Sequence, residues 1–186
     1  MTKYIRKTSL IAGGCLYIFL CNSTLNATDG YKMYYDAAAQ LLKENDFSSA
    51  EILISKAINK YKKRPLLYYF RAKLRQERLD NCLGAIIDYT KVIKLDYKSY
   101  PKAFWRRGRC FYKLRRYKQA VQDYSNCLRI LPKYGKVHFL RASAYARIGL
   151  LNKAAIDLEN AVKYSPEYRT QAKYLWDKIM KGDTDY

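Results

Sequence analysis

The sequence has few of the residues that build turns. Its 186 residues include only 8 glycines and 4 prolines, which argues against a turn-rich all-β chain and favours helices. Apolar residues make up 49% of the chain, so there is enough apolar surface for a core. We therefore expect one helical domain or one short solenoid.

Residues that carry chemistry are equally scarce. His138 is the single histidine and no CxxC pair occurs, so nothing predicts a zinc site. The chain also lacks a glycine-rich phosphate loop and a GxSxG nucleophile elbow. Asp88, Asp123 and Asp157 recur in register, which a solvated face or helix-to-helix salt bridges explain better than paired acid–base carboxylates. We expect no enzyme, no catalytic residue, no metal and no cofactor.

Acidic residues are outnumbered. The chain has 36 lysines and arginines against 16 aspartates and glutamates, a net charge of +20. Such an excess favours contact with polyanions, acidic proteins and anionic membrane surfaces. Two interpretations stay open at this point: a generally basic surface, or a positive face built for an acidic partner.

The first 27 residues contain no acidic side chain. Lys3, Arg6 and Lys7 precede an apolar run over residues 10–21, and a short polar stretch ends at Ala27. This order is typical of a secretory signal peptide, and the run is too short to span a bilayer comfortably. We expect residues 1–27 to be a signal peptide and the protein to be periplasmic or secreted. The alternatives are a membrane anchor, including lipidation at Cys15, or the endoplasmic-reticulum lumen in a eukaryote.

Removal of that segment leaves three cysteines. Cys82, Cys110 and Cys127 permit at most one disulfide and a free thiol. Burial as small apolar side chains is the simpler interpretation. Whether Cys110 and Cys127 are bonded stays open.

Three columns of residues repeat with a period of 34 to 36 residues. Small residues dominate all three, which suits helices that approach closely. The columns are Ala50, Ala85, Ala120 and Ala154; Ala38, Ala72, Gly108 and Ala142; and Ala57, Val92, Cys127 and Ala161. Each unit has the apolar spacing of two amphipathic helices of about 13 residues.

This pattern resembles the tetratricopeptide repeat. The third unit has the family's aromatic, small, aromatic, alanine, bulky and proline positions at Phe104, Gly108, Phe111, Ala120, Tyr124 and Pro132. The fourth unit has their counterparts at His138, Ala142, Tyr145, Ala154, Leu158 and Pro166. The second unit departs from the pattern, with Arg75 where an aromatic residue is usual.

The resemblance implies an all-α, right-handed superhelical solenoid of about four helix-turn-helix repeats. The repeats are expected at residues 31–64, 65–100, 101–134 and 135–168. A capping helix is expected at 169–181, because Ala172, Leu175, Trp176 and Ile179 lie on one face and the last repeat needs a cover.

In this family the first helix of each repeat lines a concave groove that binds a peptide or a partner helix. If that holds here, aromatic and basic side chains face the groove, which suits an acidic segment. The expected groove residues are Tyr69, Lys73, Lys102, Trp105, Arg109, Lys113, Lys136 and Arg147.

The function expected from the resemblance is a non-enzymatic scaffold or adaptor outside the cytoplasm that binds an acidic peptide or helix of a protein partner. One alternative is a binder of a non-protein polyanion, such as anionic lipid or an envelope polymer, with peripheral membrane contact. Export argues against nucleic acid. A second alternative is an endoplasmic-reticulum co-chaperone, although no HPD motif or KDEL-like ending is present. The oligomeric state stays open.

Overall fold

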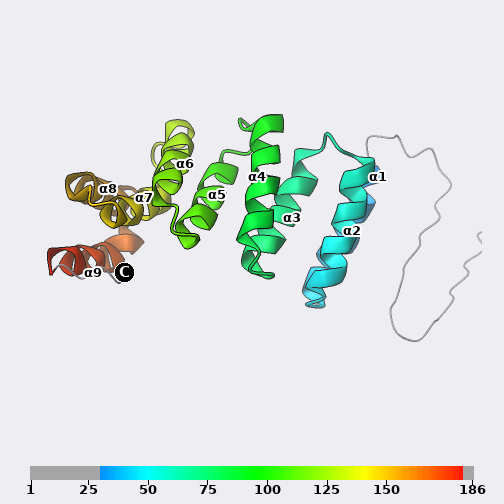
Figure 1. The fold of residues 1–186 in the computed structure, drawn as a ribbon, viewed down its shortest axis with the longest axis horizontal. Helices are drawn as coiled ribbons and strands as arrows, with labels where there is room; N and C mark the ends of the chain where they lie inside the picture. The colour runs from blue at the N-terminus through cyan, green and yellow to red at the C-terminus, as the bar shows by residue number, and fades with distance from the viewer. Residues whose placement is uncertain (1–29, 182–186) are drawn as a thin grey trace, which may run out of the picture. The chain divides into compact units, whose positions relative to one another are not determined.

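The structure is a computed structural model that describes residues 30–181, so the expected signal peptide lies outside the described residues. The described part is built of helices, with no strand (Figure 1). The helices are α1 (Gly30–Lys43), α2 (Phe47–Lys60), α3 (Pro65–Glu77), α4 (Cys82–Asp96), α5 (Lys102–Lys113), α6 (Tyr117–Ile130), α7 (Gly135–Arg147), α8 (Leu151–Tyr164) and α9 (Arg169–Met180), with a 3₁₀ turn η1 (Pro166–Tyr168) before α9. None of these helices combines the length and the apolar character needed to cross a membrane.

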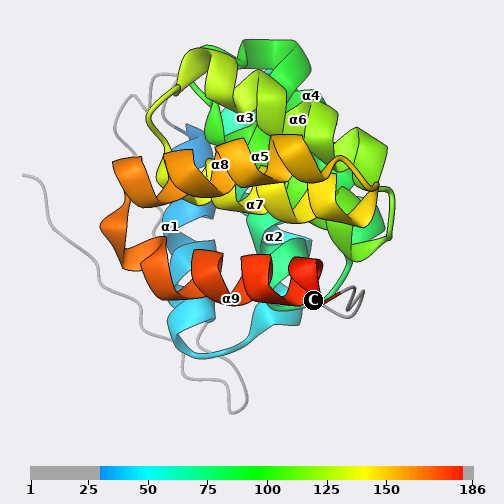
Figure 2. The ribbon, with the colours of Figure 1, turned by 90° about the vertical axis from the view of Figure 1, so that its left-hand side faces the viewer.

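The helices pack in chain order. α3 packs on α4, α5 on α6 and α7 on α8, and each of these hairpins also packs on the helix that comes before it. The first helices touch one another as well, since α5 contacts both α3 and α7. α9 lies against α7 and α8 at the C-terminal end (Figure 2). The expectation of an all-α solenoid closed by a C-terminal helix is confirmed.

Small residues allow the helices to approach. Ala38, Ala72 and Ala142 are fully buried. Gly108 in the same column has no room for a side chain, because a Cβ atom there would lie 2.7 Å from Cε1 of Tyr124 on α6. The repeating column of small residues is therefore a column of close helix contacts.

The turn inside each hairpin contains one residue with a positive φ. These residues are Asn45 (60°), Asp80 (48°), Arg115 (58°) and Gly149 (76°). After the third turn, the backbone N–H of Arg116 donates to the carbonyl of Phe111 over 2.8 Å, a bond that closes the end of α5. Only the fourth hairpin has the glycine that adopts this conformation without steric cost.

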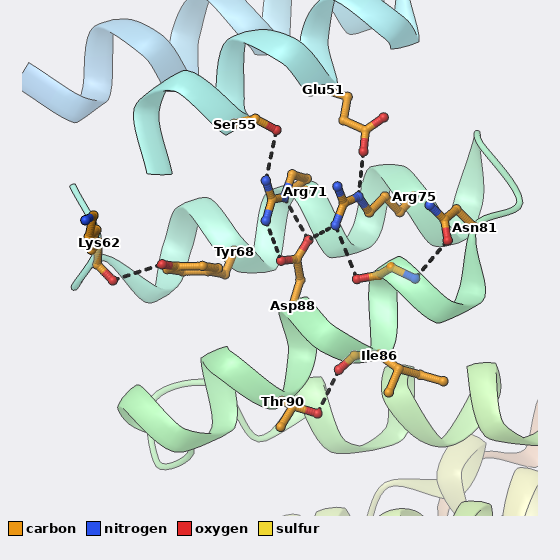
Figure 3. Close-up of polar contacts among 11 residues, drawn as sticks. Glu51, Ser55, Lys62, Tyr68, Arg71, Arg75, Asn81, Ile86, Asp88 and Thr90 are labelled. Atoms are coloured by element: carbon orange, nitrogen blue, oxygen red, sulfur yellow. Dashed lines mark hydrogen bonds and ion pairs between the residues drawn. The ribbon is translucent and has the colours of Figure 1, made fainter. Parts of the chain in front are cut away.

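A buried arginine–aspartate pair joins the two helices of the second hairpin (Figure 3). Arg71 on α3 donates to both carboxylate oxygens of Asp88 on α4, over 2.9 and 2.7 Å. The same guanidinium donates to Oγ of Ser55 on α2, over 2.9 Å. One side chain thus connects its own hairpin to the preceding one.

The same bridge recurs in the next two hairpins. Arg107 donates to Asp123 over 2.8 and 2.7 Å and to Thr90 of the previous hairpin over 2.8 Å. Arg141 binds Asp157 and Ser125 in the same way. We call these three units, Arg71–Asp88–Ser55, Arg107–Asp123–Thr90 and Arg141–Asp157–Ser125, the arginine bridges. Since each aspartate is at most 2% exposed, the salt-bridge interpretation of the aspartate column is confirmed and the solvated face is excluded.

Arg75 also has a structural explanation. Its guanidinium donates to Glu51 on α2 over 2.6 Å and to Asp88 over 2.9 Å (Figure 3). An aromatic residue at this position could not make either contact. The departure of the second repeat from the family pattern therefore adds a second link between the first two hairpins.

Candidate functional site

A cavity of about 520 Å³ opens where α3 to α7 converge. We call it the basic pocket, after the four cationic side chains that line it. Its lining residues are Gln76, Cys82, Arg109, Tyr112, Lys113, Arg115, Tyr117, Tyr124, Leu140, Ser143 and Arg147. Three of the eight expected groove residues, Arg109, Lys113 and Arg147, meet in it.

The pocket is strongly electropositive. Arg109, Lys113, Arg115 and Arg147 line it, and no carboxylate does. Lys113 pairs with Asp80 in the turn before α4, and the hydrogen bond to that carboxylate raises the pKa of Lys113. Neither Arg109 nor Arg115 forms an ion pair with any other described residue. The pocket is therefore suited to an anionic group.

Aromatic side chains line the other part of the pocket. The rings of Tyr112 and Tyr117 meet edge to face, with centroids 5.2 Å apart. The guanidinium of Arg147 lies 5.9 Å from the ring centroid of Tyr117, and its Nε donates to the Tyr112 hydroxyl over 3.5 Å. Leu140 adds an aliphatic contact from α7. An anionic group and a neighbouring apolar or aromatic side chain can thus bind side by side.

Trp105 is not an open groove residue, and this corrects the expectation from sequence. Its side chain is 3% exposed because the next repeat covers it. Tyr134 meets the indole edge to face at 6.4 Å, and the ammonium of Lys136 lies 5.0 Å from the ring centroid. The indole Nε1 is buried without a hydrogen-bond partner among the described residues. Trp105 therefore contributes mainly to the core between the third and fourth repeats.

The remaining expected groove residues lie outside the basic pocket. Lys102 is exposed, with its ammonium 6.0 Å from the ring centroid of Tyr134. Tyr69 is half-buried and accepts a hydrogen bond from Nε of Arg106 over 3.0 Å. The charges of Arg106 and Lys73 are both offset by Glu77, at 2.5 and 3.9 Å. Glu77 therefore offsets part of the positive charge of this surface, whereas no carboxylate lines the basic pocket.

Sequence reasoning missed Tyr112, Arg115 and Tyr117. It took groove residues only from columns of first helices, whereas these three lie at the end of α5, in the following turn and at the start of α6. The signal that could have found them is the clustering of basic and tyrosine residues over positions 112–117.

The described residues contain no cluster of three or more histidine, cysteine, aspartate or glutamate side chains that could hold a metal ion. Cys82, Cys110 and Cys127 are all buried as free thiols. A bond between Cys110 and Cys127, which the sequence left open, is therefore absent here.

His138 supports the arginine bridge of the fourth hairpin. Its Nδ1 lies 2.9 Å from Asp157 and its Nε2 lies 2.9 Å from the carbonyl oxygen of Pro132. Both contacts are internal to the fold, in agreement with a structural role in the aromatic column.

Comparison with known proteins gives a consistent result. Two family models, both described as tetratricopeptide repeat, match residues 101–134 and 135–168. No curated protein sequence matches the chain.

Solved structures share the fold at low sequence identity. MamA from Desulfovibrio magneticus RS-1 is 20% identical, with a TM-score of 0.72 over 83% of this chain and 86% of that chain. YrrB, described as a TPR protein with an unusual peptide-binding site, is 16% identical, with a TM-score of 0.69 over 80% of this chain and 75% of that chain. The Cut9–Hcn1 structure is 17% identical, with a TM-score of 0.68 over 80% of this chain and 29% of that chain.

Proposed function

Because the chain belongs to the tetratricopeptide-repeat family, we propose that it is a protein-interaction scaffold whose basic pocket binds an acidic segment of a partner protein. The observation that carries this proposal is the lining of the pocket, with four cations and no carboxylate. Arginine binds carboxylates through paired, charge-assisted hydrogen bonds. Arg109 and Arg115 are the two whose charge no described carboxylate offsets.

A peptide fits this site better than a simple polyanion does. Tyr112, Tyr117 and Leu140 lie beside the cations, and aromatic residues next to arginine are typical of the residues that dominate binding energy at interfaces. A uniformly charged polymer has no apolar side chains to pack against these three residues. YrrB, which shares the fold and has an unusual peptide-binding site, supports the same class of ligand. We propose that the protein acts after export, on the basis of the signal-peptide pattern in residues 1–27.

Selection from a random displayed peptide library tests the proposal, because the library supplies acidic and neutral sequences in competition. We expect the wild-type chain to enrich peptides in which aspartate or glutamate stands next to an aromatic or aliphatic residue. The Arg109→Ala/Arg147→Ala variant should enrich none of them. An enriched set without acidic residues would contradict the proposal.

The selected peptides then allow a matched comparison of affinity. Arg109→Ala should weaken binding about tenfold, whereas Lys118→Ala, which also removes one positive charge but from the exposed face of α6, should leave it unchanged. If the protein binds polyanions in general, both variants should weaken binding of anionic lipid vesicles equally. Equal losses for the selected peptides would favour that alternative over the pocket.

A further inference from the structure

The loops that join consecutive hairpins lie at one edge of the solenoid, and the turns inside the hairpins lie at the other. The loops are residues 61–64, 97–101 and 131–134, and the turns are residues 44–46, 78–81, 114–116 and 148–150. In Figure 1 the loops that enter α3 and α5 lie at the upper edge, and the turns that leave these helices lie at the lower edge.

The two edges differ in charge. The three loops contain five basic residues and no acidic residue, whereas the four turns contain three basic and three acidic residues. We call the lysines in the loops and directly beside them the lysine edge: Lys60, Lys62, Lys63, Lys98, Lys102 and Lys133. All six are exposed, and none forms an ion pair with another described residue. Asp96, which flanks the second loop, accepts a hydrogen bond from the backbone N–H of Ser99 over 3.1 Å.

A tyrosine fixes each loop to the first helix of the preceding hairpin. The ring pairs are Tyr61 with Tyr34 on α1, Tyr100 with Tyr69 on α3 and Tyr134 with Trp105 on α5, with centroids 6.2, 5.5 and 6.4 Å apart. The carbonyl oxygen of Lys62 also accepts a hydrogen bond from the Tyr68 hydroxyl over 3.1 Å (Figure 3). The loops are therefore held in place, while their lysine side chains extend into solvent.

Lysine suits a different kind of ligand from the arginines of the basic pocket. A guanidinium is a rigid fork that pairs with one carboxylate, whereas an ammonium is a hydrated point charge on a flexible stem and requires no fixed partner geometry. Six such charges spread over three loops match a surface of many mobile negative charges better than one bound side chain. A leaflet of anionic phospholipid is such a surface, and it attracts each lysine that comes near it.

We propose that the lysine edge binds the surface of a membrane that contains anionic phospholipid. Tyr97, next to Lys98, is 45% exposed, and tyrosine is enriched at the depth of lipid headgroups because its ring is apolar and its hydroxyl polar. Helices of 12 to 15 residues separate the two edges by about 20 Å. Since charges are screened over about 10 Å at 0.1 M salt, only the lysine edge is attracted, and the protein lies on the membrane in one orientation.

This orientation keeps the basic pocket accessible. Arg115 lies in the turn of the third hairpin, and Lys113 and Tyr117 lie at the helix ends on either side of it. These lining residues belong to the edge that faces away from the membrane. A membrane and a partner peptide can therefore be bound at the same time, and neither contact requires the other.

Cosedimentation of the full chain with vesicles tests the proposal. Vesicles of phosphatidylcholine mixed with phosphatidylglycerol are compared with vesicles of phosphatidylcholine alone, which measure any contribution of the apolar residues 10–21. We expect binding to require phosphatidylglycerol and to weaken as salt is added. Inorganic phosphate should release the protein no better than chloride at the same ionic strength. Equal binding to both kinds of vesicle, or stronger release by phosphate, would overturn the proposal.

Two double variants locate the contact. Lys62→Gln/Lys63→Gln should weaken binding to the anionic vesicles about fivefold for each lysine removed. Arg116→Gln/Lys118→Gln, which removes two exposed charges near the opposite edge, should leave it unchanged. Equal losses in the two variants would show that total charge, not the lysine edge, binds the membrane. Tighter binding of single-stranded DNA than of vesicles, lost in the first variant, would assign the edge to nucleic acid instead.

The same variants separate this proposal from the proposed function. Arg109→Ala/Arg147→Ala should keep vesicle binding while it loses the selected peptides, and Lys62→Gln/Lys63→Gln should do the reverse. Loss of vesicle binding in the pocket variant would contradict the assignment to the lysine edge, whatever the outcome for peptides. Circular dichroism checks that each variant keeps its helices.

Discussion

Arg141 donates two hydrogen bonds to Asp157, from Nε over 2.7 Å and from Nη2 over 2.8 Å. Burial alone would raise the pKa of this carboxyl group, but the hydrogen bonds from Arg141 and His138 outweigh it and the pKa of Asp157 is lowered. At Asp123, burial prevails over the hydrogen bonds and charge of Arg107, and the pKa is raised. The aspartates of two chemically identical arginine–aspartate pairs thus have pKa shifts of opposite sign. A histidine contacts only one of them, Asp157.

The first prediction concerns Asp157→Asn. At about pH 7 this substitution should lower the free energy of unfolding by roughly 3 kcal/mol, because it leaves the partly buried Arg141 without its counter-charge. A lowered folded-state pKa stabilises the protein above the unfolded pKa of about 3.9 and ceases to do so as pH falls through the folded value. The difference between wild type and variant should therefore shrink below about pH 4. Urea unfolding across this pH range measures it.

Asp123→Asn is the matched control for that experiment. Because the pKa of Asp123 is raised, protonation favours the folded state, and the difference between wild type and this variant should not shrink in acid. Identical pH profiles for the two variants would show that His138 has no influence on the arginine bridge.

The second prediction concerns Gly108→Ala. The new Cβ atom would lie 2.7 Å from the Tyr124 ring and 3.3 Å from Cβ of Asp123, so helices α5 and α6 must move apart. The expected loss is about 1–3 kcal/mol of unfolding free energy, measured by thermal or urea denaturation. Unchanged stability would mean that the close contact relaxes without cost.

The third prediction concerns Arg115→Gly. Arg115 has a φ of 58°, which costs a residue with a Cβ atom about 1 kcal/mol, so glycine should stabilise the fold by a similar amount. The same change removes one cation from the basic pocket and should weaken binding of the selected acidic peptides. The two effects have opposite signs, so they cannot both follow from unfolding.

Arg116→Gly provides the control for Arg115→Gly, since it removes the same charge one residue later. Arg116 has a φ of −87°, where glycine offers no relief and adds freedom to the unfolded chain. This variant should therefore gain no stability from relief of backbone strain. Equal changes in stability at both positions would rule out backbone strain as the cause.

The fourth prediction concerns residues 1–27. We expect them to be absent from protein isolated from its native compartment, because their basic, apolar and polar regions follow the order of a signal peptide. N-terminal sequencing decides the matter. An intact Met1 on a cytoplasmic protein would refute both the signal peptide and the proposed location.

Much of the fold could be predicted because the repeat period depends on local rules. Alanine and glycine recur wherever helices cross closely, and such columns are visible in one sequence. The partners of the aspartate column were missed, although Arg71, Arg107 and Arg141 recur with nearly the same period. A period shows that positions are equivalent, but which columns touch depends on how one hairpin packs on the next.

The candidate site was predicted less well for the same reason. Arg109, Lys113 and Arg147 do line one pocket. All three lie on first helices, and Lys113 and Arg147 occupy equivalent positions in their repeats. Trp105 was assigned to the open groove because of its column alone. Its exposure is decided by Tyr134 in the loop after α6 and by Lys136 on α7, whose covering effect no periodicity reveals.

The arginine bridges also make the two ends of the repeat array unequal in stability. Each bridge reaches only the hairpin before it, and the first hairpin has Ala37 and Leu53 where later ones have the arginine and the aspartate. In a linear array with nearest-neighbour coupling, the unit with the fewest couplings opens first. Backbone amides should therefore exchange with solvent most rapidly in α1, and protection should increase toward α5 and α6. Unfolding should start at the N-terminal hairpin and proceed along the chain.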